Sequence, residues 1–145
     1  AERQVKWDSV ANGGSREKQI DFFKTYTYSG VNLEKLLTTV NKRLEMLKDR
    51  DHLIGHAYFI NVYSIESLMA VFRDNLIPLL QEYFFGDYYK IQLVIGAGFI
   101  ESESASVDFA IDDEDQYDEK IIYAIAKAPW TDASAFLRAI ALMKI

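Results

Sequence analysis

The sequence predicts a mainly α-helical fold: a four-helix bundle with a small β-hairpin and a C-terminal helix appended, α+β overall. Apolar residues recur at helical spacing between residues 33 and 94, interrupted by short capped connections. Two stretches with the alternation typical of strands follow, and a last amphipathic stripe lies near the end of the chain. With 145 residues, half of them hydrophobic, the chain can bury the core of one ordinary domain.

The first helix is predicted over residues 33–48. Asn32 is a suitable N-cap, and Val31 can pack onto Leu36 as a hydrophobic staple. The helix is expected to end at Asp49-Arg50-Asp51-His52, which leads into a short apolar stretch over residues 53–62. The expected buried stripe consists of Leu33, Leu36, Leu37, Val40, Leu44 and Leu47.

Three further helices are predicted in the bundle. Ser64 caps the second, whose buried stripe is Ile65, Leu68, Met69 and Phe72. Pro78 lacks a backbone N–H, so we expect a break there and a third helix over residues 78–85. Asp87 caps a fourth, short helix that ends at Gly96-Ala97-Gly98. An aromatic cluster has few lysines or arginines near it, so we expect it to be bundle core rather than a platform for stacking nucleic-acid bases. Its residues are Tyr83, Phe84, Phe85, Tyr88 and Tyr89.

Residues 106–111 and 120–126 are predicted to form a β-hairpin around an acidic turn at 112–119. Thr131 is the expected cap of the final helix, with Phe136, Leu137, Ile140 and Ala141 on one face. A short strand at residues 5–7 could join the hairpin. The predicted organisation is an irregular segment at 1–31, the helical bundle at 32–96, and the hairpin with its helix, packed on the bundle, at 97–145.

Charge is distributed unevenly along the chain. Residues 101–119 hold nine acidic residues and no base, whereas the rest of the chain holds 13 acids and 16 bases. The acidic segment repels phosphate backbones, so we expect no direct binding of nucleic acid. The chain has no cysteine and no apolar run long enough to span a membrane, which favours a cytoplasmic protein without membrane contact.

Motifs for catalysis and for metal binding are incomplete. The phosphate-binding string Gly-x-x-x-x-Gly-Lys-Ser/Thr does not occur. His52 and His56 have the four-residue spacing of a zinc motif, but Leu53 stands where a zinc protease carries its glutamate. The acidic run at 112–115 fails the ligand pattern of a calcium loop. We therefore predict no catalytic residue and no metal site.

Several segments together resemble one known family. They are Asn41-Lys42-Arg43-Leu44-Glu45, Asp49-Arg50-Asp51-His52, Ile54-Gly55-His56-Ala57-Tyr58-Phe59, Ile77-Pro78-Leu79-Leu80-Gln81-Glu82-Tyr83-Phe84 and Lys90-Ile91-Gln92-Leu93-Val94-Ile95-Gly96. This set is similar to the C-terminal lid of the McrB family of AAA+ proteins, the motor subunits of modification-dependent restriction systems. The resemblance covers roughly residues 31–100.

The resemblance implies that the chain is a lid fragment that closes over nucleotide and mediates ring assembly, and that the catalytic core is absent. The fragment alone would then be no enzyme and hold no cofactor, whereas the full-length parent would hydrolyse GTP or ATP with Mg²⁺. Expected partners are its own AAA+ core, neighbouring subunits of a hexameric ring, and a McrC-like nuclease subunit. DNA restriction would be the biological role.

The resemblance also selects site residues. Arg50, His52, Gly55, His56 and Tyr58 are expected to lie close to the nucleotide or to a neighbouring subunit. Many AAA+ lids carry a phosphate-contacting arginine at a position that would fall near residues 76–78; none is present there, which leaves Arg73 or Arg50 as substitutes.

Two alternatives remain open from the sequence. His56 could be a structural histidine that bridges the first two helices. The chain could also be a stand-alone helical adaptor that binds proteins without nucleotide chemistry. A phosphate-binding loop and a magnesium site encoded immediately upstream would favour the motor, and a start codon would favour the adaptor.

Overall fold

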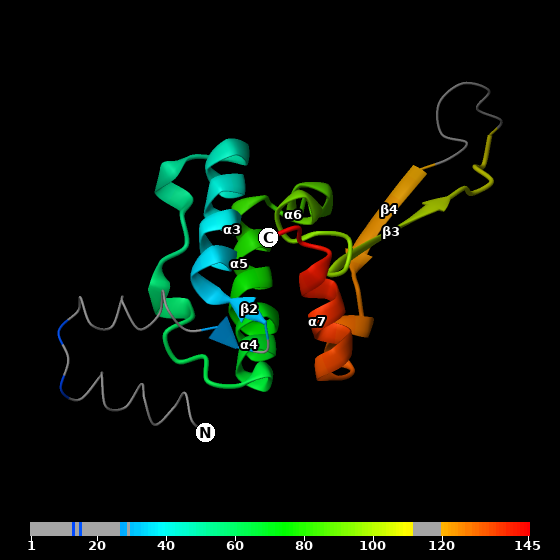
Figure 1. The fold of residues 1–145 in the computed structure, drawn as a ribbon. Coiled ribbons are helices and arrows are strands. Elements are labelled where there is room, and N and C mark those ends of the chain that lie inside the picture. Colours follow the sequence, from blue (N-terminus) through cyan, green and yellow to red (C-terminus); the bar gives the residue numbers. More distant parts are fainter. Residues whose placement is uncertain (1–12, 14, 16–26, 29, 112–119) are drawn as a thin grey trace.

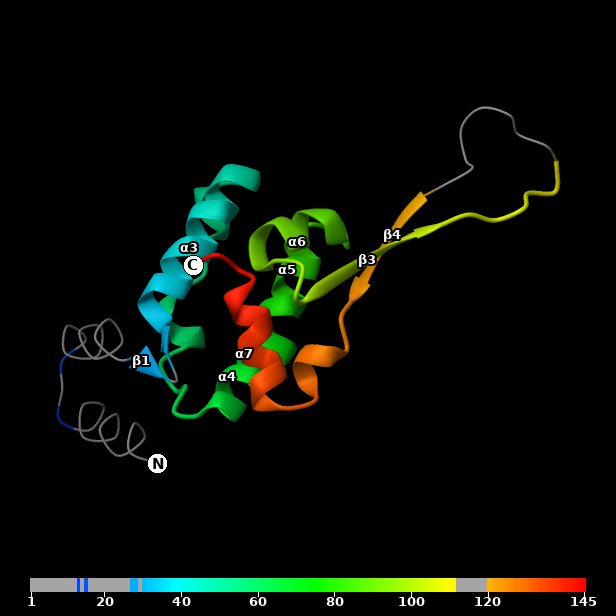
Figure 2. The ribbon, with the colours of Figure 1, turned by 45° about the vertical axis from the view of Figure 1, so that its right-hand side comes forward.

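The computed structural model describes residues 13, 15, 27–28, 30–111 and 120–145. It is mainly helical, with a small antiparallel sheet that projects from the helices (Figure 1). Helices α4 and α5 form one rod, which contacts α7 through α4 and α6 through α5, and helix α3 packs against α6 (Figure 2). The bounds are β1 Thr27–Tyr28, β2 Val31–Asn32, α3 Leu33–Leu47, α4 Ile65–Val71, α5 Ile77–Tyr83, α6 Tyr88–Ile95, β3 Ile100–Ala105, β4 Lys120–Ile125 and α7 Ala133–Ala141.

Helix α3 confirms the first predicted helix almost to the residue. The Asn32 side chain accepts a hydrogen bond of 3.0 Å from the backbone N–H of Lys35, which satisfies one of the donors left free at a helix start. The predicted stripe is buried from Leu33 to Leu44, and Leu47 is partly buried against the core. This helix supplies one wall of the core.

The predicted break at Pro78 is wrong. Helix α4, a π-helical turn at Phe72–Leu76 and helix α5 follow one another without interruption. In that wide turn the N–H of Ile77 donates to the carbonyl of Phe72, five residues back. A regular α-helix would bring the proline ring against the carbonyl of Asp74, and the widened turn accommodates it. The second and third predicted helices are therefore one rod, which begins at the Ser64 cap as expected.

Helix α6 begins at the predicted cap, where Asp87 accepts from the N–H of Lys90 at 3.3 Å. It ends at Gly96, which has a φ of 90°, a value that glycine adopts readily and that strains other residues. Gly98 has a different role: a Cβ there would lie 2.6 Å from Cα of Ala139. The glycine thus lets helix α7 approach the backbone closely.

The first strand of the hairpin lies earlier than predicted. Strand β3 covers Ile100–Ala105 rather than 106–111, whereas β4 at Lys120–Ile125 agrees with the prediction. Pairing starts at the bundle, where buried Ile100 faces Ile125 and the N–H of Ala126 donates to the carbonyl of Phe99. This anchor sets the register, so the polar run from Glu101 becomes the strand. The predicted turn at 112–119 lies outside the described residues.

Helix α7 is capped by Asp132, not by Thr131 as predicted. Asp132 accepts from the N–H of Ala135 at 2.7 Å, and the hydroxyl of Thr131 instead donates to the carbonyl of Ala128 in the 3-10 turn Ala128–Trp130. Helix α7 contacts α4, and its Phe136 lies in the same buried cluster as the bundle residues. The C-terminal helix therefore shares the core of the bundle.

The segment before the bundle is not wholly irregular. Strands β1 and β2 pair antiparallel, with Thr27 opposite Asn32 and Tyr28 opposite Val31. Gly30 has φ of 82° in the tight connection between them. The strand predicted at residues 5–7 lies outside the described residues. Within the described part, none of the helices has the length and apolar character needed to cross a membrane.

The burial of α3 gives a stability test. Leu44 is fully buried, and Leu44→Ala should lower the free energy of unfolding by about 2–5 kcal/mol through lost burial and a residual cavity. Met46 on the same helix is 85% exposed, so Met46→Ala should change it by less than about 0.5 kcal/mol. Urea melts of both variants measure the difference, and equal midpoints would show that the assigned buried face is wrong.

Candidate functional site

The segment that contains the predicted site is held to α3 by one side chain. Asn41 donates through its amide nitrogen to the carbonyl of Ile54 at 2.9 Å and accepts from the N–H of Ile54 at 2.7 Å. This pair of hydrogen bonds satisfies a loop backbone much as a neighbouring strand would. Asn41 therefore fixes the position of the backbone at Ile54, from which the residues of the predicted site follow.

Buried apolar side chains fix the rest of the segment. Ile54, Phe59 and Val62 are in the core, whereas the residues between them face outward. The backbone forms two 3-10 turns, Arg50–His52 and His56–Tyr58. His52 and His56 are half-buried, and Arg50, Gly55 and Tyr58 are exposed. The predicted site residues thus lie on a rigidly anchored surface loop.

Neither the backbone conformation at Gly55 nor the described residues around it require glycine at this position. Its φ of −83° and ψ of 164° are ordinary extended values that any residue adopts. Apart from its two chain neighbours, the described residues place no heavy atom within 4 Å of a Cβ built on it. The chain itself would thus accept alanine at this position, and an exposed backbone without a side chain is left beside His56.

His52 belongs to a polar cluster with Asp49 and two tyrosines. Its Nδ1 lies 2.5 Å from the carboxylate of Asp49, and its ring meets Tyr83 edge-on at a centroid distance of 4.9 Å. The hydrogen bond from His52 lowers the pKa of Asp49. The pKa of Tyr83 is raised by burial first, with a smaller contribution from the neighbouring Tyr58. The structure therefore brings the turn that contains His52 against Tyr83 of helix α5.

The two arginines considered as phosphate contacts are both paired with carboxylates. Arg50 donates through Nε to Glu45 at 2.7 Å, and its side chain is 84% exposed. Arg73 forks onto Asp74 with distances of 2.9 and 3.1 Å. The pKa of Asp74 is lowered by this hydrogen bond. Arg50 lies next to the His52 cluster, whereas Arg73 lies on the π turn of the rod.

His56 opens the second 3-10 turn, where its carbonyl accepts from the N–H groups of Phe59 and Ile60. His52 and His56 occupy separate turns rather than one helical face. Among the residues that the structure describes, no group of three His, Asp or Glu side chains could hold a metal ion.

The predicted aromatic core holds only in part. Phe84 is buried and Tyr83 and Tyr88 are half-buried, but Tyr89 is 50% exposed and Phe85 is 92% exposed. Phe85 follows helix α5 with φ of 50°, a left-handed conformation that is costly for a bulky side chain. The next residue, Gly86, donates to the carbonyl of Gln81 and closes the helix end. The Nζ of Lys48 lies 5.7 Å from the centre of the exposed ring.

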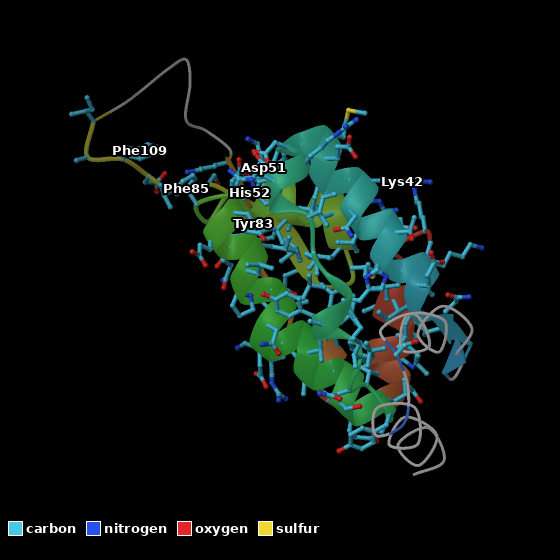
Figure 3. All side chains as sticks on the ribbon, turned by 90° about the vertical axis from the view of Figure 1, so that its left-hand side faces the viewer. Lys42, Asp51, His52, Tyr83, Phe85 and Phe109 are labelled. Carbon is cyan, nitrogen blue, oxygen red and sulfur yellow. The ribbon has the colours of Figure 1, made fainter. Side chains whose placement is uncertain are left out.

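Figure 3 shows His52, Tyr83 and Phe85 together at one end of the molecule, with Asp51 beside them and Lys42 on the other side of α3. Sequence reasoning missed Asn41, Tyr83 and Phe85 as members of this site. None of the three had a local signal, because the contacts that place them join segments far apart in the sequence. We use the name site face for the exposed or half-buried residues Gly55, His56, Tyr58, His52 and Phe85 taken together.

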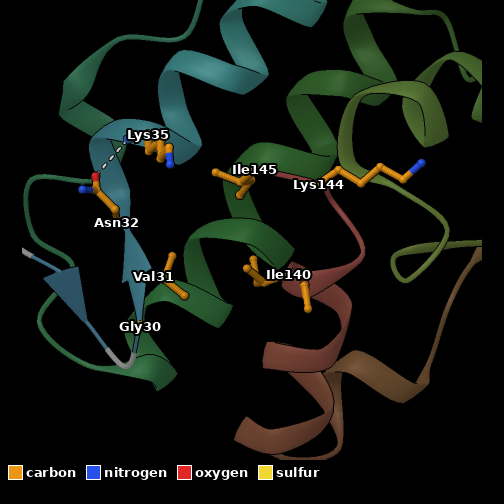
Figure 4. Close-up of a pocket in the computed structure, with 8 residues that line it drawn as sticks. Gly30, Val31, Asn32, Lys35, Ile140, Lys144 and Ile145 are labelled. Atoms are coloured by element: carbon orange, nitrogen blue, oxygen red, sulfur yellow. Dashed lines mark hydrogen bonds between the residues drawn. The ribbon is translucent and has the colours of Figure 1, made fainter.

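A separate hollow of about 380 Å³ lies between β2, the start of α3 and the end of α7 (Figure 4). Lys35 and Lys144 lie on its rim, and Ile140 forms part of its apolar wall. None of the predicted site residues lines it. It is thus distinct from the site face.

The fold is a small helical bundle with an anchored, exposed loop, an architecture compatible with an α-helical lid. Residues 32–92 match the family model of McrB, alpha-helical lid domain, so this part of the chain is similar to a McrB lid. The match covers the rod, helix α3, the site face and most of α6. A comparison with curated proteins gave no match.

The His52–Asp49 pair predicts a dependence of stability on pH. The pKa of Asp49 is lower in the folded chain than its ordinary value of 3.8, so the pair stabilises the fold above that value and the contribution is lost as the pH falls through the folded pKa. His52→Ala should move the pKa of Asp49 back toward 3.8. It should also flatten the loss of stability below about pH 4.

Carboxyl titration by NMR and urea melts across the acid range measure both effects. Asp51→Asn is the matched control, because the side chain of Asp51 is exposed and its hydrogen bond to the Asp49 carboxylate comes from the backbone N–H. An Asp49 pKa that is the same with and without His52 would contradict the assignment.

Proposed function

We propose that this lid closes over a nucleotide bound by an AAA+ core outside these residues, and that it mediates assembly of the ring. The parent would hydrolyse GTP or ATP with Mg²⁺ and work with a McrC-like nuclease subunit in restriction. The lid contributes contacts and movement, and the missing core contributes the chemistry.

The observation that carries the proposal is Gly55. Neither its backbone angles nor its surroundings within the described chain require glycine. A bare, exposed backbone allows another molecule to approach more closely than any side chain would. The approaching group would be the core, its nucleotide or a neighbouring subunit.

The rest of the site face supports a docking role. Tyr58 and Phe85 offer exposed aromatic surface, the kind of side chain that anchors protein interfaces. Phe85 retains a strained backbone without burying its ring, and strain of this kind gathers at functional sites. Because Arg50 and Arg73 are already paired, the proposal assigns neither of them to the terminal phosphate.

A substitution at Gly55 tests the proposal. Gly55→Ala should leave the isolated lid as stable as before or stabilise it by up to about 1 kcal/mol, because the residue can adopt the native angles and loses freedom only in the unfolded chain. In the full-length protein the added methyl group should weaken nucleotide-dependent ring assembly, measured by sedimentation with GTP or ATP and Mg²⁺.

Gly30→Ala is the matched control. Its φ of 82° disfavours alanine, so this variant should lose stability by about 1 kcal/mol without affecting assembly at equal folded concentration. If Gly55→Ala assembles and hydrolyses nucleotide as the unmodified protein does, the site face is not used for docking.

His56 gives a second test of the same face. We expect His56→Ala to impair ring assembly or hydrolysis in the full-length protein more than it impairs folding of the isolated lid. Urea melts of the lid and hydrolysis assays of the full-length variant separate the two effects. Should the isolated variant unfold while the full-length enzyme turns over normally, His56 is a structural residue.

A further inference from the structure

The β3–β4 hairpin is an acidic arm with apolar residues on both faces. It leaves the bundle at α6 and points away from α3 (Figures 1 and 2). Cross-strand pairs place Glu103 beside Ile122 on one face and Ser104 beside Ile121 on the other. Ile121 is 56% exposed and Ile122 is 46% exposed.

A two-stranded ribbon alone is marginally stable in water, and the exposed isoleucines on its two faces are available to a partner. Within the described part of the chain, the arm pairs with no third strand. Its described residues carry three acids, Glu101, Glu103 and Asp108, and one base, Lys120. A complementary partner would offer an apolar hollow with a basic rim.

The bundle offers such a hollow on its own surface. A depression of about 390 Å³ between α3 and α6 is lined by Lys42, Arg43, Met46, Leu47 and Leu93. Met46 is 85% exposed and Leu93 is 44% exposed, which makes an open apolar floor. Both charged residues of the lining are bases, and the acid next to Met46, Glu45, is paired with Arg50 at 2.7 Å.

We infer that the arm of one copy of this chain docks into the α3–α6 hollow of a second copy. Ile122 would cover Met46 and Leu93, and Glu101 and Glu103 on the same face would approach Lys42. Lys120 of that face lies beyond this contact, opposite Ala105 at the outer end of the arm. Figure 3 shows Lys42 on the outer side of α3, away from the site face. The docking surface therefore leaves the site face free.

The two surfaces differ, so the contact is head-to-tail, and it closes into a ring or continues as an open chain. The inference deepens the proposed ring assembly and rests on it for the closure of the ring. The contact itself is a property of this chain alone. Its small size makes it a weak interface, so it is measured at high protein concentration.

Sedimentation of the isolated chain at concentrations up to about 1 mM tests the contact, because weak interfaces are populated only there. We expect the average mass to rise with concentration and to fall on adding salt. Glu101→Lys with Glu103→Lys reverses the charge of the arm, and Lys42→Glu reverses the charge at the rim of the hollow. Each variant alone should associate about tenfold more weakly, because like charges then meet.

Mixing the two variants is the decisive measurement. In the mixture, the basic arm of the first variant can dock into the acidic hollow of the second. The acidic arm of the second variant can dock into the basic hollow of the first, so association should return to the original strength. Met46→Ser should weaken association at unchanged stability, and Glu66→Lys, a charge change at an exposed position of α4, should have no effect.

An unmodified chain that remains monomeric, or a mixture that does not recover, would overturn the inference. Neither result would touch the proposed closure over nucleotide, which the Gly55 variant tests in the full-length protein. Association that survives Lys42→Glu would place the acceptor elsewhere on the chain and would also overturn it.

Discussion

Three buried aromatic rings hold the parts of this molecule together. Phe72 of the π turn lies 5.1 Å from Phe99, in the loop after α6, and 5.3 Å from Phe136 of α7, measured between ring centres. Such pairs add about 0.5–1.5 kcal/mol each beyond the area they bury. Phe72 belongs to the region that matches the McrB lid, whereas Phe99 and Phe136 follow it. Arg43 reinforces the junction, since its guanidinium donates to the carbonyls of Val94 and Met143.

The parts of the fold that depend on local chemistry could be predicted. Asn32, Ser64 and Asp87 cap helices because their side chains reach a backbone N–H three residues ahead. One error was local, since Asp132 rather than the adjacent Thr131 caps α7, and two others arose where a distant contact prevails over a local preference. Packing of the rod requires a continuous helix through Pro78, and the buried base of the hairpin draws a polar run into strand β3.

The site was predictable to a similar extent. The motif around Gly55 and His56 directed attention to the loop, but nothing local shows that Asn41 holds it, because that pair of hydrogen bonds spans thirteen residues. Tyr83 enters through the packing of α5 against the turn that contains His52. Phe85 has the apolar character of a core residue in the sequence. Its ring faces outward because the backbone at Phe85 adopts a left-handed conformation at the end of α5.

The π turn also sets how this region tolerates changes in length. A wide turn holds one residue more than an α-helical turn, so deletion of a single exposed residue such as Asn75 would convert the rod into regular α-helix. The wide turn takes up its extra residue locally, so the helix after the deletion would keep Leu80 and Phe84 facing the core. The ring of Pro78 would then meet the carbonyl four residues before it, a clash that the wide turn avoids. The rod is therefore expected to keep its residue count wherever this proline is present, because the extra residue accommodates the ring.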